Sequence, residues 1–164
     1  MQIFNLTRLN LNSPYKIWMR HSSYIFVTDY GVQYRIEFSQ NQDIWQNGAY
    51  EFGILNENNR NSPNDPKVKK TIQCLIEEFF LMNPDILLYQ CETGDNRQAM
   101  RARLFTKWFN EYDYQNRFYV KVSVLRDEEI DNYIALIVQK NTPELEAIKQ
   151  TFDSFVGFFS NKPK

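Results

Sequence analysis

Two arginines give the chain its clearest candidate for binding chemistry. Arg97 and Arg101 lie four residues apart, so in a helix they share one face with Trp108. A guanidinium group is seldom buried without a partner, and its planar set of donors fits a carboxylate or a phosphate. The pattern leaves two alternatives: an internal Asp or Glu in a structural ion pair, which is the commoner arrangement, or an anionic ligand.

The residues just before these arginines predict where such a ligand would bind. Asp95 can cap a helix whose third residue, Gln98, reaches back to the cap, so the helix begins near Asn96. Free backbone amides and the helix dipole favour negative charge at such an N-terminus. The candidate ligand-binding residues are Thr93, Gly94, Asp95, Arg97 and Arg101.

The same stretch has the spacing C-x-x-G-x-x-R from Cys91 to Arg97. It resembles the phosphate loop of cysteine-dependent phosphatases, a resemblance that implies a nucleophilic thiolate at Cys91 and a phosphate-binding Arg97. The chain departs from that family's pattern, since Gln90 replaces a His, Gln98 replaces a Ser or Thr, and Asp95 adds a negative charge. A buried, unreactive thiol at Cys91 is the alternative that we favour.

The remaining groups predict neither a metal site nor a cofactor. His21 is the only histidine, which excludes sites built from several imidazoles, and a solvated side chain explains it. The acidic residues within 127–131 lack the spacing of a calcium loop and fit an exposed hairpin turn. The sequence has no glycine loop for a nucleotide or dinucleotide. We therefore expect no cofactor and favour a non-catalytic role.

A modest basic patch opens the first long helix predicted. Lys67, Lys69 and Lys70 lie close in sequence to Arg60. A solvated helix face explains these charges, and contact with nucleic acid is the weaker interpretation. The whole chain has 19 Lys and Arg against 20 Asp and Glu, so no general field attracts nucleic acid or an anionic membrane.

Length and composition indicate one folded domain over residues 1–164. No segment reaches the ~20 apolar residues of a membrane span, and the start of the chain lacks a secretory pattern. Cys74 and Cys91 are too few for a disulfide framework, so we expect free thiols and a cytoplasmic location. None of these features sets an oligomeric state.

Alternating and helical patterns predict an α+β fold. The predicted elements are strands over 24–28, 32–38 and 49–55, a helix over 66–82, a strand from Ile86, a helix over 96–113, strands over 118–124 and 133–139, and a helix from Thr142. This order, β-β-β-α-β-α-β-β-α, mixes hairpins with crossovers. We expect a mostly antiparallel mixed sheet with about three packed helices.

Two stretches fit no regular pattern. Residues 1–20 contain apolar side chains without a clear period, so we expect an N-terminal arm over the core or an edge strand. Residues 56–65 are polar and rich in turn formers, which is typical of a mobile surface loop.

A longer pattern covers residues 89–109: Y-x-C, then D-x-R, then R-x-R-L-F-x-x-W-F. It resembles a bacterial family of small proteins of unknown function, and the similarity extends through residues 24–38 and 68–80. The resemblance implies no activity. The residues that match the paired-arginine part of its motif are Arg97, Arg101, Trp108 and Phe109.

Our leading hypothesis is a non-catalytic cytoplasmic binding or regulatory module. The loop at 92–96, with Arg97 and Arg101, would take a protein partner or a small anionic ligand. A phosphatase-like enzyme using Cys91 is the alternative hypothesis. A nucleic-acid-binding accessory protein is the third, and it requires the lysines of 67–70 to be continuous with the arginines.

Overall fold

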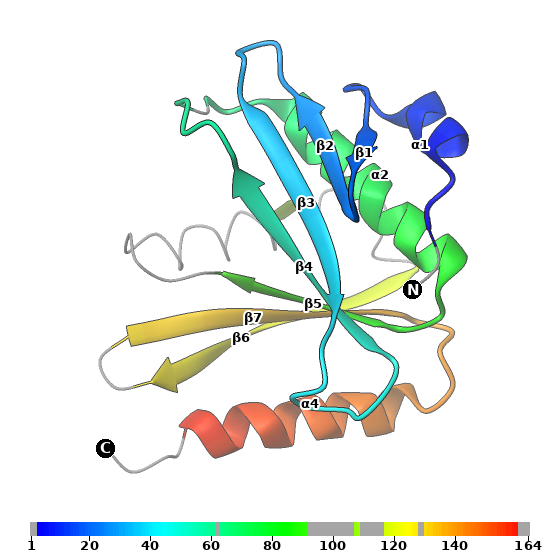
Figure 1. Cartoon of the computed structure of the whole chain (residues 1–164). Coiled ribbons are helices and arrows are strands. Elements are labelled where there is room, and N and C mark those ends of the chain that lie inside the picture. Colours follow the sequence, from blue (N-terminus) through cyan, green and yellow to red (C-terminus); the bar gives the residue numbers. More distant parts are fainter. Residues whose placement is uncertain (1–2, 62, 92–106, 109–116, 128–129, 161–164) are drawn as a thin grey trace. The chain divides into compact units, whose positions relative to one another are not determined.

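A computed structural model describes residues 3–61, 63–91, 107–108, 117–127 and 130–160. The elements are α1 (Leu6–Asn12), β1 (Trp18–Arg20), β2 (Ser23–Val27), β3 (Gln33–Gln40), β4 (Ala49–Asn56), α2 (Pro66–Met82), β5 (Ile86–Cys91), β6 (Phe118–Asp127), β7 (Ile130–Gln139) and α4 (Leu145–Ser160). The described strands form one sheet in the order β1-β2-β3-β4-β5-β7-β6 (Figure 1). The predicted α+β class, mostly antiparallel sheet and element order are confirmed.

The chain divides into two compact units. Unit 1 comprises residues 1–39 and 52–84, and unit 2 comprises residues 40–51 and 85–164. Strand β4 is shared, because its first three residues belong to unit 2 and the rest to unit 1. No linker composition marks this division in the sequence.

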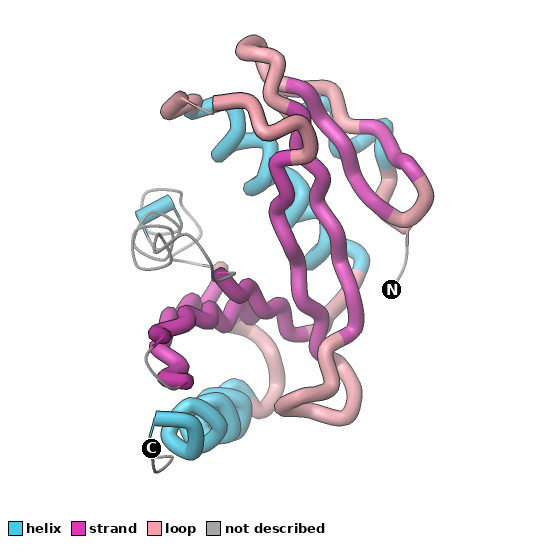
Figure 2. Tube along the Cα trace, turned by 60° about the vertical axis from the view of Figure 1, so that its left-hand side comes forward, coloured by secondary structure: helices cyan, strands magenta, loops and turns pink. Residues whose placement is uncertain are grey.

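In unit 1, the hairpin of β2 and β3 forms as its alternating sequence predicts (Figure 2). Tyr24 lies opposite Ile36 on one side of the hairpin, and Ile25 lies opposite Arg35 on the other side, where Ile25 is buried as well. The turn uses Gly31 at φ +77°, a conformation that residues with a Cβ seldom adopt. The register therefore fixes which side chains of the two strands share a side, while Tyr24, Ile25 and Phe26 of β2 are all buried.

Aromatic rings connect this hairpin to α2. Phe38 of β3 stacks on Phe79 of α2 with ring centroids 5.7 Å apart. It also meets Phe4 edge to face at 5.1 Å, and Phe4 stacks on Tyr24 at 4.7 Å. These rings fill the space between helix and sheet, as offset and edge-to-face pairs favour.

Helix α2 begins and ends at the predicted residues. The Asp65 side chain accepts the N–H of Lys67 at 3.0 Å, Pro66 is the first helical residue, and Asn83 caps the end. The N–H of Asn83 donates to the Phe79 carbonyl at 2.8 Å. The buried apolar stripe consists of Val68, Ile72, Leu75, Ile76, Phe79 and Phe80.

The N-terminal residues contain a helix that the sequence pattern did not predict. Asn5 caps α1, and its side chain accepts the N–H of Arg8 at 3.0 Å. Phe4 and Leu9 are buried, and β1 then pairs with β2. A seven-residue helix is too short to show a period or to be stable alone, so tertiary contacts must hold it.

The polar stretch after β4 is attached to the β2–β3 turn by side chains. Asn58 donates from Nδ2 to the Gly31 carbonyl at 2.8 Å, and its Oδ1 accepts the N–H of Gln33 at 3.1 Å. The Arg60 guanidinium lies against Gly31, so that a Cβ there would be 2.9 Å from Nη1. The mobility expected for residues 56–65 stays a prediction. The contacts of Asn58 and Arg60 with the β2–β3 turn would restrain such motion.

In unit 2, β7 lies between β5 and β6 and runs antiparallel to both. β6 and β7 pair without interruption from Phe118 opposite Gln139 to Asp127 opposite Ile130. Only residues 128 and 129 separate the strands, so the hairpin is longer than the sequence pattern predicted. The prediction stopped each strand at the start of the charged stretch, although charged residues continue the ladder at the end of a hairpin.

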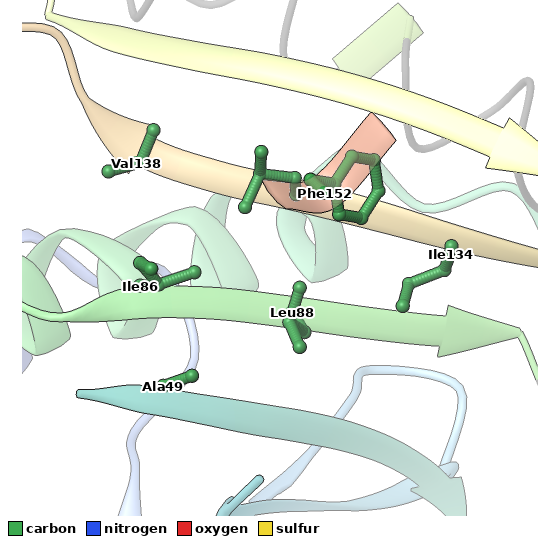
Figure 3. Close-up of a cluster of buried hydrophobic side chains, with 7 residues drawn as sticks. Ala49, Ile86, Leu88, Ile134, Val138 and Phe152 are labelled. Carbon is green, nitrogen blue, oxygen red and sulfur yellow. The ribbon is translucent and has the colours of Figure 1, made fainter. Parts of the chain in front are cut away.

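Helix α4 lies along one face of the β6–β7 hairpin (Figures 1 and 2). It begins at Leu145 and not at Thr142, because the N–H of Thr142 donates to the Gln139 carbonyl at 3.1 Å in a turn and Glu144 has φ +63°. The core of this unit, shown in Figure 3, consists of Ala49, Ile86, Leu88, Ile134, Leu136, Val138 and Phe152.

Candidate functional site

Strand β5 leads directly to the predicted site. Ile86, Leu87 and Leu88 are buried, as expected for a strand that is covered on both faces. β5 pairs antiparallel with β7, and its last residue, Cys91, lies opposite Tyr133. The backbone at the start of the C-x-x-G-x-x-R stretch is therefore fixed by a sheet ladder.

The β6–β7 hairpin turns at this same end of the strands. Tyr133, opposite Cys91, follows the first residue of β7, Ile130, by only three positions. Ile130 in turn pairs with the last residue of β6, Asp127. Because antiparallel neighbours bring the end of one strand beside the start of the next, the chain leaves β5 near the β6–β7 turn.

The predicted ligand-binding residues Thr93, Gly94, Asp95, Arg97 and Arg101 lie outside the described residues. The side chain of Cys91 does too, so the structure places only its backbone. Lys107 and Trp108 are described and helical, in agreement with the helix predicted over 96–113. The roles of these residues as ligand contacts, nucleophile or phosphate binder stay predictions.

Arg8 is an arginine beside the core whose guanidinium group is paired with a carboxylate of the same chain. Its Nε and Nη2 donate to the two carboxylate oxygens of Glu78 at 3.0 and 2.5 Å, and the Glu78 side chain is only 3% exposed. The N–H of Asn5 donates to the same carboxylate at 3.2 Å. Hydrogen bonding to Glu78 raises the pKa of Arg8. This bidentate pair attaches α1 to α2, and without it Glu78 would be a buried, uncompensated charge.

A second carboxylate, Glu57, serves two arginines on the side of the β2–β3 hairpin away from α2. Arg20 donates to it, Arg35 Nη1 lies 3.3 Å from its Oε1, and Gln33 Nε2 donates to its Oε2 at 2.6 Å. These contacts lower the pKa of Glu57, the hydrogen bond from Gln33 most of all. Internal pairing is thus an arrangement that this chain uses repeatedly for its arginines.

One lysine of the predicted basic patch is already paired. Lys67 Nζ lies 2.9 Å from Asp29 Oδ2, and it sits 5.6 Å from the ring centroid of Tyr15. The hydrogen bond with Asp29 raises the pKa of Lys67. Part of the charge that a nucleic acid would contact is therefore compensated, and nucleic-acid binding stays a prediction.

Tyr15 lies beneath this lysine and connects three segments of unit 1. Its hydroxyl donates to Asp65 Oδ2 at 2.5 Å and accepts the N–H of Asp29 at 3.2 Å. Burial and, next, the hydrogen bond with Asp65 raise the pKa of Tyr15 to about 12. The hydroxyl is therefore protonated at neutral pH and acts as a structural donor.

The sequence patterns missed both polar contacts, for different reasons. The position of Glu78 could have indicated its contact, because it lies one turn from Leu75 on the apolar stripe of α2. A carboxylate on such a buried face requires a cationic partner. No sequence pattern indicated the contacts of Tyr15, since it follows Pro14 in a stretch without periodicity. Contacts between segments distant in sequence are invisible to such patterns.

The described residues hold no group of three His, Cys, Asp or Glu side chains that could bind a metal ion. His21 is exposed in the β1–β2 turn, at φ 56°. Cys74 is a buried free thiol whose pKa is raised by burial, which disfavours the reactive thiolate. Of the helices in the described part of the chain, none is long and apolar enough to cross a membrane.

The model of a family of unknown function (DUF6169) matches residues 64–154, which is more than half of the chain. The matched stretch includes α2, the three strands of the β5–β7 region and every residue of the predicted site. No curated protein matches the chain.

Proposed function

The chain belongs to this family of unknown function, DUF6169, and we propose that it is a non-catalytic binding module with its site at residues 92–101. The observation that carries the proposal is the end of β5. Arg97 and Arg101 follow Cys91, the last residue of a buried strand, by six and ten positions. A loop that a rigid strand positions is a common location for binding residues.

The chemistry of the site selects an anion. Two guanidinium groups on one predicted helix face, and free amides at that helix's N-terminus, favour a phosphate or carboxylate group on a small molecule or protein partner. The buried thiol at Cys74 and the resemblance to a bacterial family support a bacterial cytoplasmic protein.

The test is a calorimetric titration with inorganic phosphate. Arg97→Met and Arg101→Met should each abolish the binding seen with the parent chain. The matched control is Arg20→Met, which removes a guanidinium that already pairs with Glu57 and should leave phosphate binding intact. The proposal fails if the parent does not bind phosphate, or if Arg97→Met binds it as the parent does.

An activity assay separates this proposal from its enzymatic rival. The parent chain should not hydrolyse an aryl phosphate. Release of the aryl alcohol that disappears in Cys91→Ser would replace the binding module by a phosphatase-like enzyme using the C-x-x-G-x-x-R stretch.

A further inference from the structure

Strand β6 is a long edge of the sheet. It is the last strand in the sheet order, and it pairs with β7 on one side through ten consecutive residues without a bulge or a proline. Among the described strands, none pairs with its other side. Such an edge is a template for the addition of another strand.

One hydrogen bond shows which backbone N–H and C=O groups of β6 point away from β7. The Arg117 carbonyl accepts the N–H of Lys140 at 2.8 Å, one position before Phe118 pairs with Gln139. In an antiparallel ladder, successive residues direct their backbone groups alternately towards and away from the partner strand. Val120 and Val122 therefore point their N–H and C=O groups away from β7.

Among the described side chains of β6, the charge at the centre of the strand is already paired. Lys121 is the cation at its centre, and its Nζ lies 2.6 Å from Asp153 Oδ1 of α4, which raises the pKa of Lys121. Val120 and Val122 lie on the opposite face of the strand, opposite Ile137 and Ala135 of β7. Lys121 therefore places no uncompensated charge beside the outward backbone groups of Val120 and Val122.

We propose that β6 pairs antiparallel with β6 of a second copy of this chain, about a two-fold axis at Val120. The N–H of Val120 in each copy then donates to the Val120 carbonyl of the other. Tyr119 comes opposite Lys121 of the second copy, so that no lysine faces a lysine. The formal net charge of −1 opposes such an association very little.

Self-pairing fits this strand better than a foreign peptide does, because the sequence about Val120 is self-complementary. Small β-branched side chains meet on one face, and an aromatic ring meets a cation on the other. Within one copy the same combination already occurs, since Lys149 Nζ lies 4.4 Å from the Tyr119 ring centroid. The proposal is independent of the anion site at 92–101.

Charge exchange at the two-fold axis tests the proposal. In sedimentation velocity, the parent should form a dimer as its concentration rises. Val120→Lys and Val120→Glu should each be monomeric alone, because like charges meet directly across the axis, and their equimolar mixture should be dimeric again. Val120→Thr, which adds no charge, should dimerise as the parent does.

The matched control is the same exchange at Val122. In the proposed register the two Val122 side chains lie about 13 Å apart along the strands, so mixing Val122→Lys with Val122→Glu should give no more dimer than either variant forms alone. The proposal is overturned if the parent stays monomeric at every concentration, or if the Val120 mixture fails to associate while both variants keep the parent's circular dichroism.

A measurement on the unmodified chain covers the case in which the charged variants do not fold. Lysine crosslinking of the parent mixed with its ¹⁵N-labelled form should join Lys121 of one copy to Lys121 of the other. The absence of this mixed-isotope link in a sample that sediments as a dimer would place the interface elsewhere and would also overturn the proposal.

Discussion

The two ends of the strand order differ in how they expose backbone. β1 has three residues, and the residue before it, Ile17, already has a partner: Asn10 Nδ2 donates to its carbonyl at 2.9 Å, and its N–H donates to Asn10 Oδ1 at 2.8 Å. β6 has ten residues in an unbroken ladder with β7. One amide side chain thus takes the place of a neighbouring strand at β1, whereas no described strand does so at β6.

This difference gives α1 a structural role. The helix supplies Asn10 to the sheet edge, and Arg8 attaches the same helix to α2 through Glu78. Short edge strands and blocked backbone groups are known ways to prevent unwanted strand pairing. In unit 1 the side chain of Asn10 occupies the backbone groups next to the edge strand, and we predict that unit 2 uses its edge strand to bind a partner.

The largest effect is expected from removing the support of β6. Phe152→Ala should lower the free energy of unfolding by about 3–5 kcal/mol, because this side chain of α4 is fully buried in the core beneath β6 and β7. Urea denaturation measures it, and dimer formation should be lost as well. Phe158→Ala is the control, since that ring is 69% exposed and should matter little. Equal losses from both variants would contradict the assignment of the core.

The next effect comes from opening the protected edge. Asn10→Ala should destabilise the chain by about 1–3 kcal/mol, because the backbone groups of the buried Ile17 lose their partner. It should also increase association with concentration in light scattering, as a second edge becomes accessible. Asn12→Ala, on the exposed end of α1, should change neither property. A variant that is less stable but associates no more than the parent would refute the blocking role of Asn10.

The smallest effect concerns the anchor of the segment that enters β1. Tyr15→Phe should cost about 1 kcal/mol at neutral pH, through the lost hydrogen bond to Asp65. The pKa of Tyr15 is raised to about 12, so its contribution is complete below its unfolded pKa near 10 and is lost as pH rises towards 12.

Urea denaturation between these pH values should therefore show a shallower loss of stability in Tyr15→Phe than in the parent. Part of the loss should remain, because burial also raises the pKa of Tyr24. Tyr30→Phe, at an exposed position, should follow the parent curve. Parallel curves for the parent and Tyr15→Phe would contradict the anchoring role.

Local patterns predicted most of the fold for physical reasons. The cap at Asp65 and the stop at Asn83 depend on neighbouring backbone groups alone, so the sequence determines them. The alternation through Ile36 likewise fixes the buried side of β3. α1 escaped prediction because Glu78, the carboxylate that holds it through Arg8, lies 70 positions away in the sequence.

The candidate site was less predictable than the fold. A periodic pattern can put Arg97 and Arg101 on one face, but their counter-charge depends on tertiary contacts, as Arg8 and Glu78 illustrate. The length of the β6–β7 hairpin was missed for a related reason. The sequence pattern ends the two strands at 124 and 133 and places the acidic residues of 127–131 in the turn, although cross-strand register carries the ladder through Arg126 and Asp131.

Amide hydrogen exchange compares the two edges most directly. It should be followed residue by residue at several protein concentrations, at Val120 and Val122 in β6 and at Met19 in β1. Exchange at the two valines should slow as the protein concentration rises, while exchange at Met19 should stay constant. Exchange at Val120 and Val122 that does not depend on concentration would contradict the pairing of β6 with a second copy.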